Sequence, residues 1–217
     1  MEPTPGAKRR ALGRGRRAPE EFETAYTDTF GEVGEAGVGT AQITRMGGRL
    51  PAGEGISIHE LKVLQADAEG RGFSADIYDL NLLGGVESAE PAAVLVVRNG
   101  AAWLGVDAGD AYAEHEALEF DTKKKSRGKV KNALARHVTV FGETASDPDF
   151  EAGKGRVHAI DSVACIKTAI DSIGDKLPRL KNLVAEGNKY HDARAGIGPH
   201  GDTERRVVIA ARYGRSI

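Results

Sequence analysis

The order of apolar and polar residues predicts several strands in the first half of the chain. Residues 75–82 alternate apolar and polar side chains, as a half-buried strand does. Residues 92–97 form a continuous apolar run that ends at the turn pair Asn99-Gly100, and residues 101–106 are again mostly apolar. This order predicts a β-hairpin in the core. Residues 57–64 fit either a short helix or a strand.

The second half of the chain combines strands with helices. Residues 138–141 predict a strand, and residues 163–173 space their apolar side chains as an amphipathic helix does. A second helical stretch is predicted at 177–184, and an apolar strand at 207–211. Trp103 is the only Trp, and we expect it to anchor the core. The fold class that follows is α+β, with more strands than helices.

Charge divides the chain into a basic tail and a domain. The totals nearly cancel, with 30 Lys and Arg against 32 Asp and Glu, a net charge of -2. Residues 1–20 contain many basic and almost no apolar residues, so they cannot offset their ordering entropy by burial and are predicted to be disordered. Residues 21–217 then form the folded domain.

A second basic cluster lies inside the predicted domain. It consists of Lys123, Lys124, Lys125, Arg127, Lys129 and Lys131. Such a cluster is either a solvated face or a surface that follows a phosphate backbone, and it contains no aromatic residues for base stacking. A nucleic-acid partner is therefore a hypothesis that rests on charge alone.

Cysteine content and hydropathy exclude several classes of protein. Cys165 is the single cysteine, so the chain has no internal disulfide and no thiolate zinc cage. We expect a reducing, intracellular compartment, with nucleus and cytoplasm not distinguished. The longest apolar run, residues 91–97, is far shorter than the roughly 20 residues of a membrane span, so we expect no membrane association.

The residues with the clearest chemistry lie near the C-terminus. His200 and Asp202 are separated by one residue, so on an extended chain their side chains point to the same side. An imidazole and a carboxylate on one side suit two positions of an octahedral Fe(II). His191 and Asp192, by contrast, are adjacent and would face opposite sides of a strand.

The surroundings of this pair carry a family resemblance. Asn188 and Tyr190 form Asn-x-Tyr, Gly-Ile-Gly follows, and after His200-Gly201-Asp202 comes an apolar strand that closes on Gly214. This order resembles the AlkB-like Fe(II)/2-oxoglutarate-dependent dioxygenases. The resemblance implies a partial double-stranded β-helix, or jelly-roll-like fold, with flanking helices. It also implies Fe(II) as cofactor and 2-oxoglutarate as cosubstrate.

The same resemblance implies roles for single residues and a reaction. His200 and Asp202 would be two members of the metal-binding triad, and Asn188 and Tyr190 would hydrogen-bond 2-oxoglutarate. The expected reaction is hydroxylation, which on an N-methyl group leads to demethylation. Alkylated nucleic acids are among the substrates of AlkB-like proteins.

The chain departs from the family pattern after Asp202. The family places a distal His and a following Arg on later strands, but no His follows His200 here. We therefore expect the oxygenase domain to be incomplete at its C-terminus, and activity of this chain to be in doubt. The alternative is a non-catalytic, β-rich module that binds nucleic acid or protein. A zinc hydrolase built on His191, His200 and Asp202 would lack a His-Glu-x-x-His motif.

Overall fold

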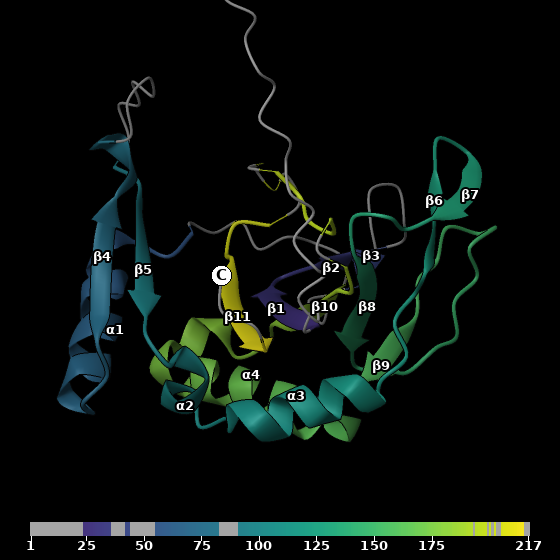
Figure 1. The fold of residues 1–217 in the computed structure, drawn as a ribbon. Coiled ribbons are helices and arrows are strands. Elements are labelled where there is room, and N and C mark those ends of the chain that lie inside the picture. The colour runs from purple at the N-terminus through teal and green to yellow at the C-terminus, as the bar shows by residue number, and fades with distance from the viewer. Residues whose placement is uncertain are drawn as a thin grey trace, which may run out of the picture.

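The computed structural model describes most of the domain. The residues it describes are 24–35, 42–43, 55–82, 91–192, 194–198, 200, 202 and 205–214. The predicted disordered tail, residues 1–20, lies outside these residues. The described residues form a mixed α+β structure with several sheets and four α-helices (Figure 1).

The largest sheet has five strands in the order β11-β1-β10-β8-β9, and it does not close on itself in the described residues. All neighbours are antiparallel except β8 and β9, which are parallel. The strands are β1 (Ala25–Gly31), β8 (His137–Gly142), β9 (Val157–Ala159), β10 (Val184–Tyr190) and β11 (Ile209–Gly214). The first strand of the described chain thus lies between two of the last.

Three two-stranded sheets surround this sheet. Their strands are β2 (Gly34–Glu35) with β3 (Gln42–Ile43), β4 (Ala75–Asp79) with β5 (Ala93–Val97), and β6 (Lys123–Ser126) with β7 (Lys129–Asn132). The β4–β5 pair stands to one side of the large sheet, and the β6–β7 hairpin projects on the other (Figure 1).

The α-helices are α1 (Ile58–Gly70), α2 (Gly100–Trp103), α3 (Ala108–Ala117) and α4 (Ala164–Lys176). Single 3-10 turns are η1 (Leu80–Leu82), η2 (Ile160–Ser162) and η3 (Pro178–Leu180). Helix α1 packs against β4 and β5 and begins with a capping box, in which Ser57 and Glu60 exchange hydrogen bonds. Helix α4 has no cap of its own; the Glu114 carboxylate of α3 accepts from the amides of Ala164 and Cys165.

The five-stranded sheet has two chemically different faces. Residues paired directly across strands point to the same face, so the register separates the two sets. One face packs on α3 and α4 and supplies core residues such as Tyr26, Phe30, Phe141 and Tyr213. The other face, which we call the polar face, carries Thr27, Thr29, Glu186, Asn188, Tyr190 and Arg212.

A buried polar pair lies in the core between the helices and the sheet. His115 of α3 contacts the Asp28 carboxylate through Nε2 at 2.9 Å and the Ala111 carbonyl oxygen through Nδ1 at 2.7 Å. Burial raises the pKa of Asp28. Burial is the largest single effect and opposes the charged imidazole of His115, but the hydrogen bond and charge of Asp28, with the Ala111 carbonyl and Glu114, together raise the His115 pKa. The pair therefore retains a proton between its two members.

Several predicted elements are confirmed and two are wrong. The strand at 138–141 and the helix at 163–173 are present as β8 and α4, and the strand predicted at 75–82 is present as β4 up to Asp79, after which residues 80–82 form η1. The hairpin across Asn99-Gly100 is wrong, because β5 pairs with β4 and residues 100–103 form a helix. The helix at 177–184 is also wrong, since only η3 forms there and Val184 begins β10.

The strand predicted at 207–211 is present as β11, displaced toward the C-terminus. Trp103 is buried in the core, and its indole N–H donates to Asp67, 2.8 Å away. None of the described helices has the length and hydropathy to cross a bilayer.

Candidate functional site

The predicted metal ligands His200 and Asp202 face each other. The Nε2 atom of His200 lies 3.6 Å from Oδ1 of Asp202. Nδ1 of His200 lies 2.9 Å from the Gly198 carbonyl oxygen, which only an N–H can satisfy. Nδ1 of His200 therefore donates to this carbonyl, and Nε2 is the ring nitrogen that faces the carboxylate.

A buried arginine fixes Asp202 against the sheet. Arg205 donates to Oδ2 of Asp202 at 3.1 Å and, through Nε, to the Val33 carbonyl oxygen at 2.8 Å. Its other terminal nitrogen bonds the Glu186 carboxylate of β10. Because Arg205 is only 5% exposed, it forms a rigid link between the loop that carries Asp202 and the sheet.

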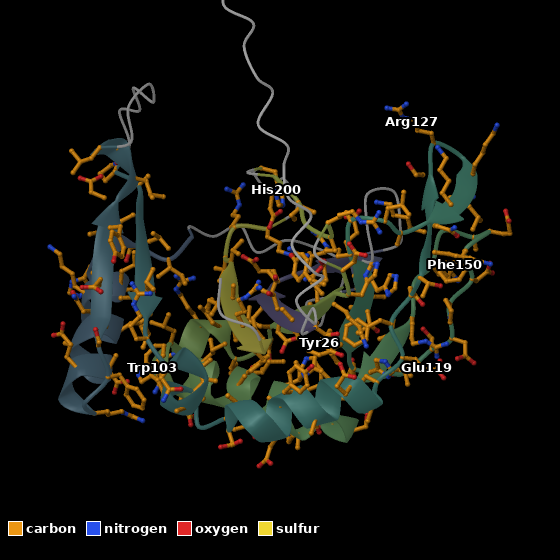
Figure 2. The ribbon with its side chains drawn as sticks, viewed as in Figure 1. Tyr26, Trp103, Glu119, Arg127, Phe150 and His200 are labelled. Atoms are coloured by element: carbon orange, nitrogen blue, oxygen red, sulfur yellow. The ribbon has the colours of Figure 1, made fainter. Side chains whose placement is uncertain are left out.

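Glu186 is the centre of this link. Its side chain is 3% exposed and accepts from Arg136 at 3.2 Å, from Arg205, and from the Glu35 amide at 3.3 Å. A buried carboxylate needs such partners, since an unpaired charge there would be costly. The loop of His200 and Asp202 is therefore held over the polar face, and Figure 2 shows His200 on the side of the sheet away from α3.

Asn188 and Tyr190 lie on the same strand and the same face as Glu186. Asn188 is 3% exposed, and its Nδ2 donates to the carbonyl oxygens of Thr27 at 3.2 Å and Glu186 at 3.4 Å. Its Oδ1 is buried with no hydrogen-bond partner. The Arg212 guanidinium lies 5.8 Å from the centre of the Tyr190 ring, within cation–π range.

Two other histidines, His158 and His191, make contacts away from the His200–Asp202 pair. His158 contacts the Glu119 carbonyl oxygen at 3.0 Å through Nε2. His191 stacks on His137 with ring centres 3.8 Å apart. Within the part of the chain that the structure describes, no three His, Cys, Asp or Glu side chains gather as a metal-binding group.

The predicted basic cluster forms the β6–β7 hairpin. Its turn contains Arg127 with φ 51° and Gly128 with φ 73°, both in the left-handed region. Lys124 pairs directly with Lys131, and Ser126 with Lys129, so three lysines share one face of the hairpin. Figure 2 shows Arg127 at the tip of the hairpin, on the same side of the sheet as His200.

Sequence reasoning missed the residues that position the site. Glu186, Arg205 and Arg136 were not singled out, because nothing in the local sequence distinguishes them from charged residues on a surface. Arg212 was also missed, although it interrupts the apolar strand that follows Asp202. The family resemblance points to the metal and cosubstrate ligands, but it does not indicate the residues that hold them in place.

The site thus belongs to a mixed α+β protein that holds a His/Asp pair over the polar face of an antiparallel sheet. The chain is similar to "Uncharacterized protein R156" of Acanthamoeba polyphaga mimivirus, with 32% identity over 201 residues that span 91% of this chain and 77% of the viral protein. The chain belongs to the family of that protein. No protein-family model and no solved structure matches this chain.

Proposed function

We propose that this chain is an Fe(II)/2-oxoglutarate-dependent dioxygenase whose fold is part of a double-stranded β-helix. The observation that supports this most is the His200–Asp202 pair, with the imidazole Nε2 and the carboxylate turned toward each other over the polar face. A sheet that is covered by helices on one face and carries polar side chains on the other is compatible with such a fold.

The donor atoms fit a metal ion in type and approximately in spacing. Two ligands about 2.1 Å from a metal and at right angles to each other lie about 3.0 Å apart. The observed 3.6 Å needs only a small rotation of the exposed His200 ring. His200 and Asp202 would be two of the three protein ligands of a facial triad.

When bound, Fe(II) with 2-oxoglutarate and O2 supplies the oxidation of a substrate C–H bond, and the cosubstrate is converted to succinate and CO2. The residues of the chain itself position the metal ligands. Arg205 and Glu186 hold the Asp202 carboxylate in place, and the Gly198 carbonyl holds the His200 ring. Asn188 and Tyr190, which lie on the same face of β10, would bind 2-oxoglutarate.

The test measures metal binding to the full chain. Mn(II) is the probe, since it resists oxidation and accepts the same ligands, and binding is followed by titration calorimetry. We expect His200→Ala and Asp202→Ala each to weaken Mn(II) binding at least tenfold. The matched control is His59→Ala, because His59 is an exposed histidine on α1.

A second titration separates the cosubstrate from the metal. We expect Asn188→Ala and Tyr190→Phe to bind Mn(II) as the parent does and to lose affinity for 2-oxoglutarate. Absence of Mn(II) binding by the parent would refute the proposal. So would equal Mn(II) binding by the parent and His200→Ala.

A nucleic acid is the substrate class that the charge distribution favours. Lys124 and Lys131 lie directly opposite each other on β6 and β7, an arrangement of like charges that destabilises a hairpin unless an anion lies nearby. A phosphate backbone would supply that anion. In this case the double variant Lys124→Ala with Lys131→Ala should lower the slope of log K against log salt for single-stranded DNA by about 1.4, whereas Lys62→Ala should leave it unchanged.

The non-catalytic alternative predicts a different result from the same proteins. A binding module would hold the DNA equally well with His200→Ala and without metal. It would also produce no succinate from 2-oxoglutarate.

A further inference from the structure

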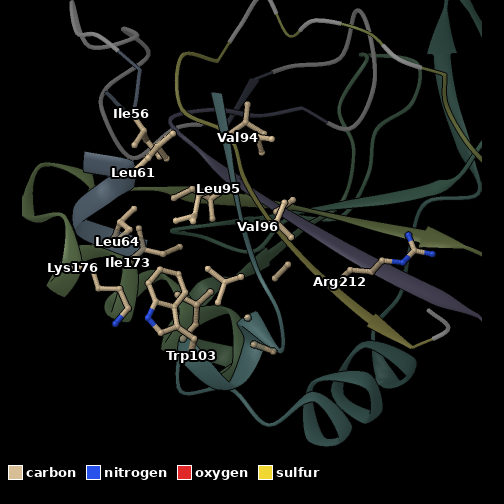
Figure 3. Close-up of a pocket in the computed structure, with 18 of the residues that line it drawn as sticks. Ile56, Leu61, Leu64, Val94, Leu95, Val96, Trp103, Ile173, Lys176 and Arg212 are labelled. Carbon is tan, nitrogen blue, oxygen red and sulfur yellow. The ribbon is translucent and has the colours of Figure 1, made fainter. Parts of the chain in front are cut away.

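A groove of about 950 Å³ lies between the β4–β5 pair and the five-stranded sheet (Figure 3). Its floor is apolar and comes from α1, α2 and α4, with Leu64, Trp103 and Ile173 among the residues that line it. Two exposed valines, Val94 of β5 and Val208 just before β11, lie at its walls, 41% and 50% exposed. The groove does not include His200 or Asp202.

Both walls are the edges of sheets. Consecutive residues 93–98 line one wall and 208–212 the other, whereas no residue of β4 or β1 lines the groove. Successive side chains of a strand point to opposite faces of its sheet, so a groove that met one face would be lined by every second residue. Here consecutive residues line each wall, so the groove meets the edge of each strand. In the described residues β5 pairs only with β4 and β11 only with β1, so the unpaired edges of β5 and β11 border the groove.

The two edge strands run in the same direction. Figure 1 shows the arrowheads of β5 and β11 at the same end, near the helices. Strand β5 leads directly into α2, and β11 ends at Gly214, close to Tyr112 of α3. One strand inserted between them and running the opposite way would be antiparallel to both. It would join β4–β5 to the antiparallel sheet of β11, β1, β10 and β8.

The charged residues of the described chain that line the groove are all positive. Among the described residues, four basic side chains line the groove and no Asp or Glu does. Lys176 is paired with Asp67, and Arg212 lies over Tyr190. The guanidinium groups of Arg98 and Arg206 have no hydrogen bond or ion pair among the described residues. A ligand of the groove is therefore expected to bring apolar side chains for the floor and carboxylates for these two arginines.

We propose that this groove binds an extended acidic polypeptide segment of a partner protein, which pairs as a β-strand with the edges of β5 and β11. Main-chain hydrogen bonds to two edges would give affinity, and alternating apolar and acidic side chains would give specificity. The proposal is independent of the metal site and would stand if that site were refuted.

The test uses a short capped peptide in which Glu and Val alternate and which contains no aromatic residue. Binding to the full chain is followed by the emission of Trp103, the only Trp, which lies in the floor of the groove. Three matched peptides serve as probes of mechanism. One has the same composition in two blocks, one is N-methylated at alternate amides, and one carries Lys in place of Glu.

We expect the alternating peptide to bind and each matched peptide to bind at least tenfold more weakly. Val94→Asp, Val208→Asp and the pair Arg98→Glu with Arg206→Glu should each lower affinity at least tenfold. The control is Val63→Asp, because Val63 is 49% exposed on α1 and does not line the groove. These substitutions are at exposed positions, so thermal unfolding should be unchanged.

Four results would overturn the proposal. They are no binding of the alternating peptide, equal binding of the N-methylated peptide, equal binding by all groove variants, or a dimer in solution that Val208→Asp converts to a monomer. The last result would identify a second copy of the chain as the occupant. If Val208→Asp lowers the stability of the free chain and the peptide does not bind, a segment of the chain itself covers the groove.

Discussion

Replacing Glu186 with Gln removes the charge at the centre of the link that holds Asp202, with little change of shape. Arg136 and Arg205 would then face a neutral amide in place of a carboxylate. Arg136 is 20% exposed and reaches water, whereas Arg205 is only 5% exposed and does not. Arg205 keeps one anionic partner, Asp202, at 3.1 Å.

The size of the effect follows from these contacts. Breaking a buried ion pair by removing one partner costs about 3–5 kcal/mol. Arg205 keeps its contact to Asp202 and Arg136 is partly exposed, so we expect Glu186→Gln to cost an amount near the lower end of this range. The expected loss of unfolding free energy is about 3 kcal/mol. For a chain of this size that corresponds to a fall in melting temperature of about 6–12 °C.

The assay is urea unfolding followed by Trp103 fluorescence, with Glu69→Gln as the control. Glu69 is exposed on α1, so its change should be within about 0.5 kcal/mol. A double-mutant cycle with Arg205→Met isolates the contact, and we expect a coupling of at least about 1 kcal/mol. A loss below about 1 kcal/mol for Glu186→Gln, or additive effects in the cycle, would refute the reasoning.

Two other predictions concern polar pairs elsewhere in the fold. The hydrogen bond from Arg179 lowers the pKa of Glu60 from 4.5 to about 2. The stability that this carboxylate contributes is therefore present above pH 4.5 and is lost as the pH falls toward 2. The difference in unfolding free energy between the parent and Glu60→Gln should shrink over that range, and a constant difference would contradict this prediction. Asp28→Ala should destabilise the chain by about 3–5 kcal/mol, because it leaves His115 buried without its partner. Asp28→Val combined with His115→Leu should lie closer to the parent in urea unfolding, and a double variant less stable than the single one would contradict the assignment.

Local sequence rules predicted the elements whose pattern agrees with their environment. Strand β4 alternates because one side packs on α1, and α4 is amphipathic because one side packs on the sheet. At Asn99 the local geometry was right, with φ 55° in the left-handed region. The hairpin was wrong because the apolar residues that follow, with Trp103 among them, pack as a helical turn against the core.

Only the part of the candidate site that is formed by residues close in sequence could be predicted. His200 and Asp202 face each other because residues two apart on an extended chain share a side, which the sequence alone indicates. Glu186, Arg205 and Arg136 come from distant parts of the chain, and nothing local distinguishes them from charged residues on a surface. Their burial is a result of tertiary packing, which no local pattern contains.

The position of β1 between β10 and β11 has a consequence for the synthesis of the protein. Among the described strands β1 is made first, but its two partners β10 and β11 are made last, so β1 leaves the ribosome with two unpaired edges. At 5–20 residues per second, β1 waits roughly ten to forty seconds before β11 emerges. This interior strand of the sheet must therefore be kept from wrong pairing during translation, and this interval is when the nascent chain is most open to aggregation or to a chaperone.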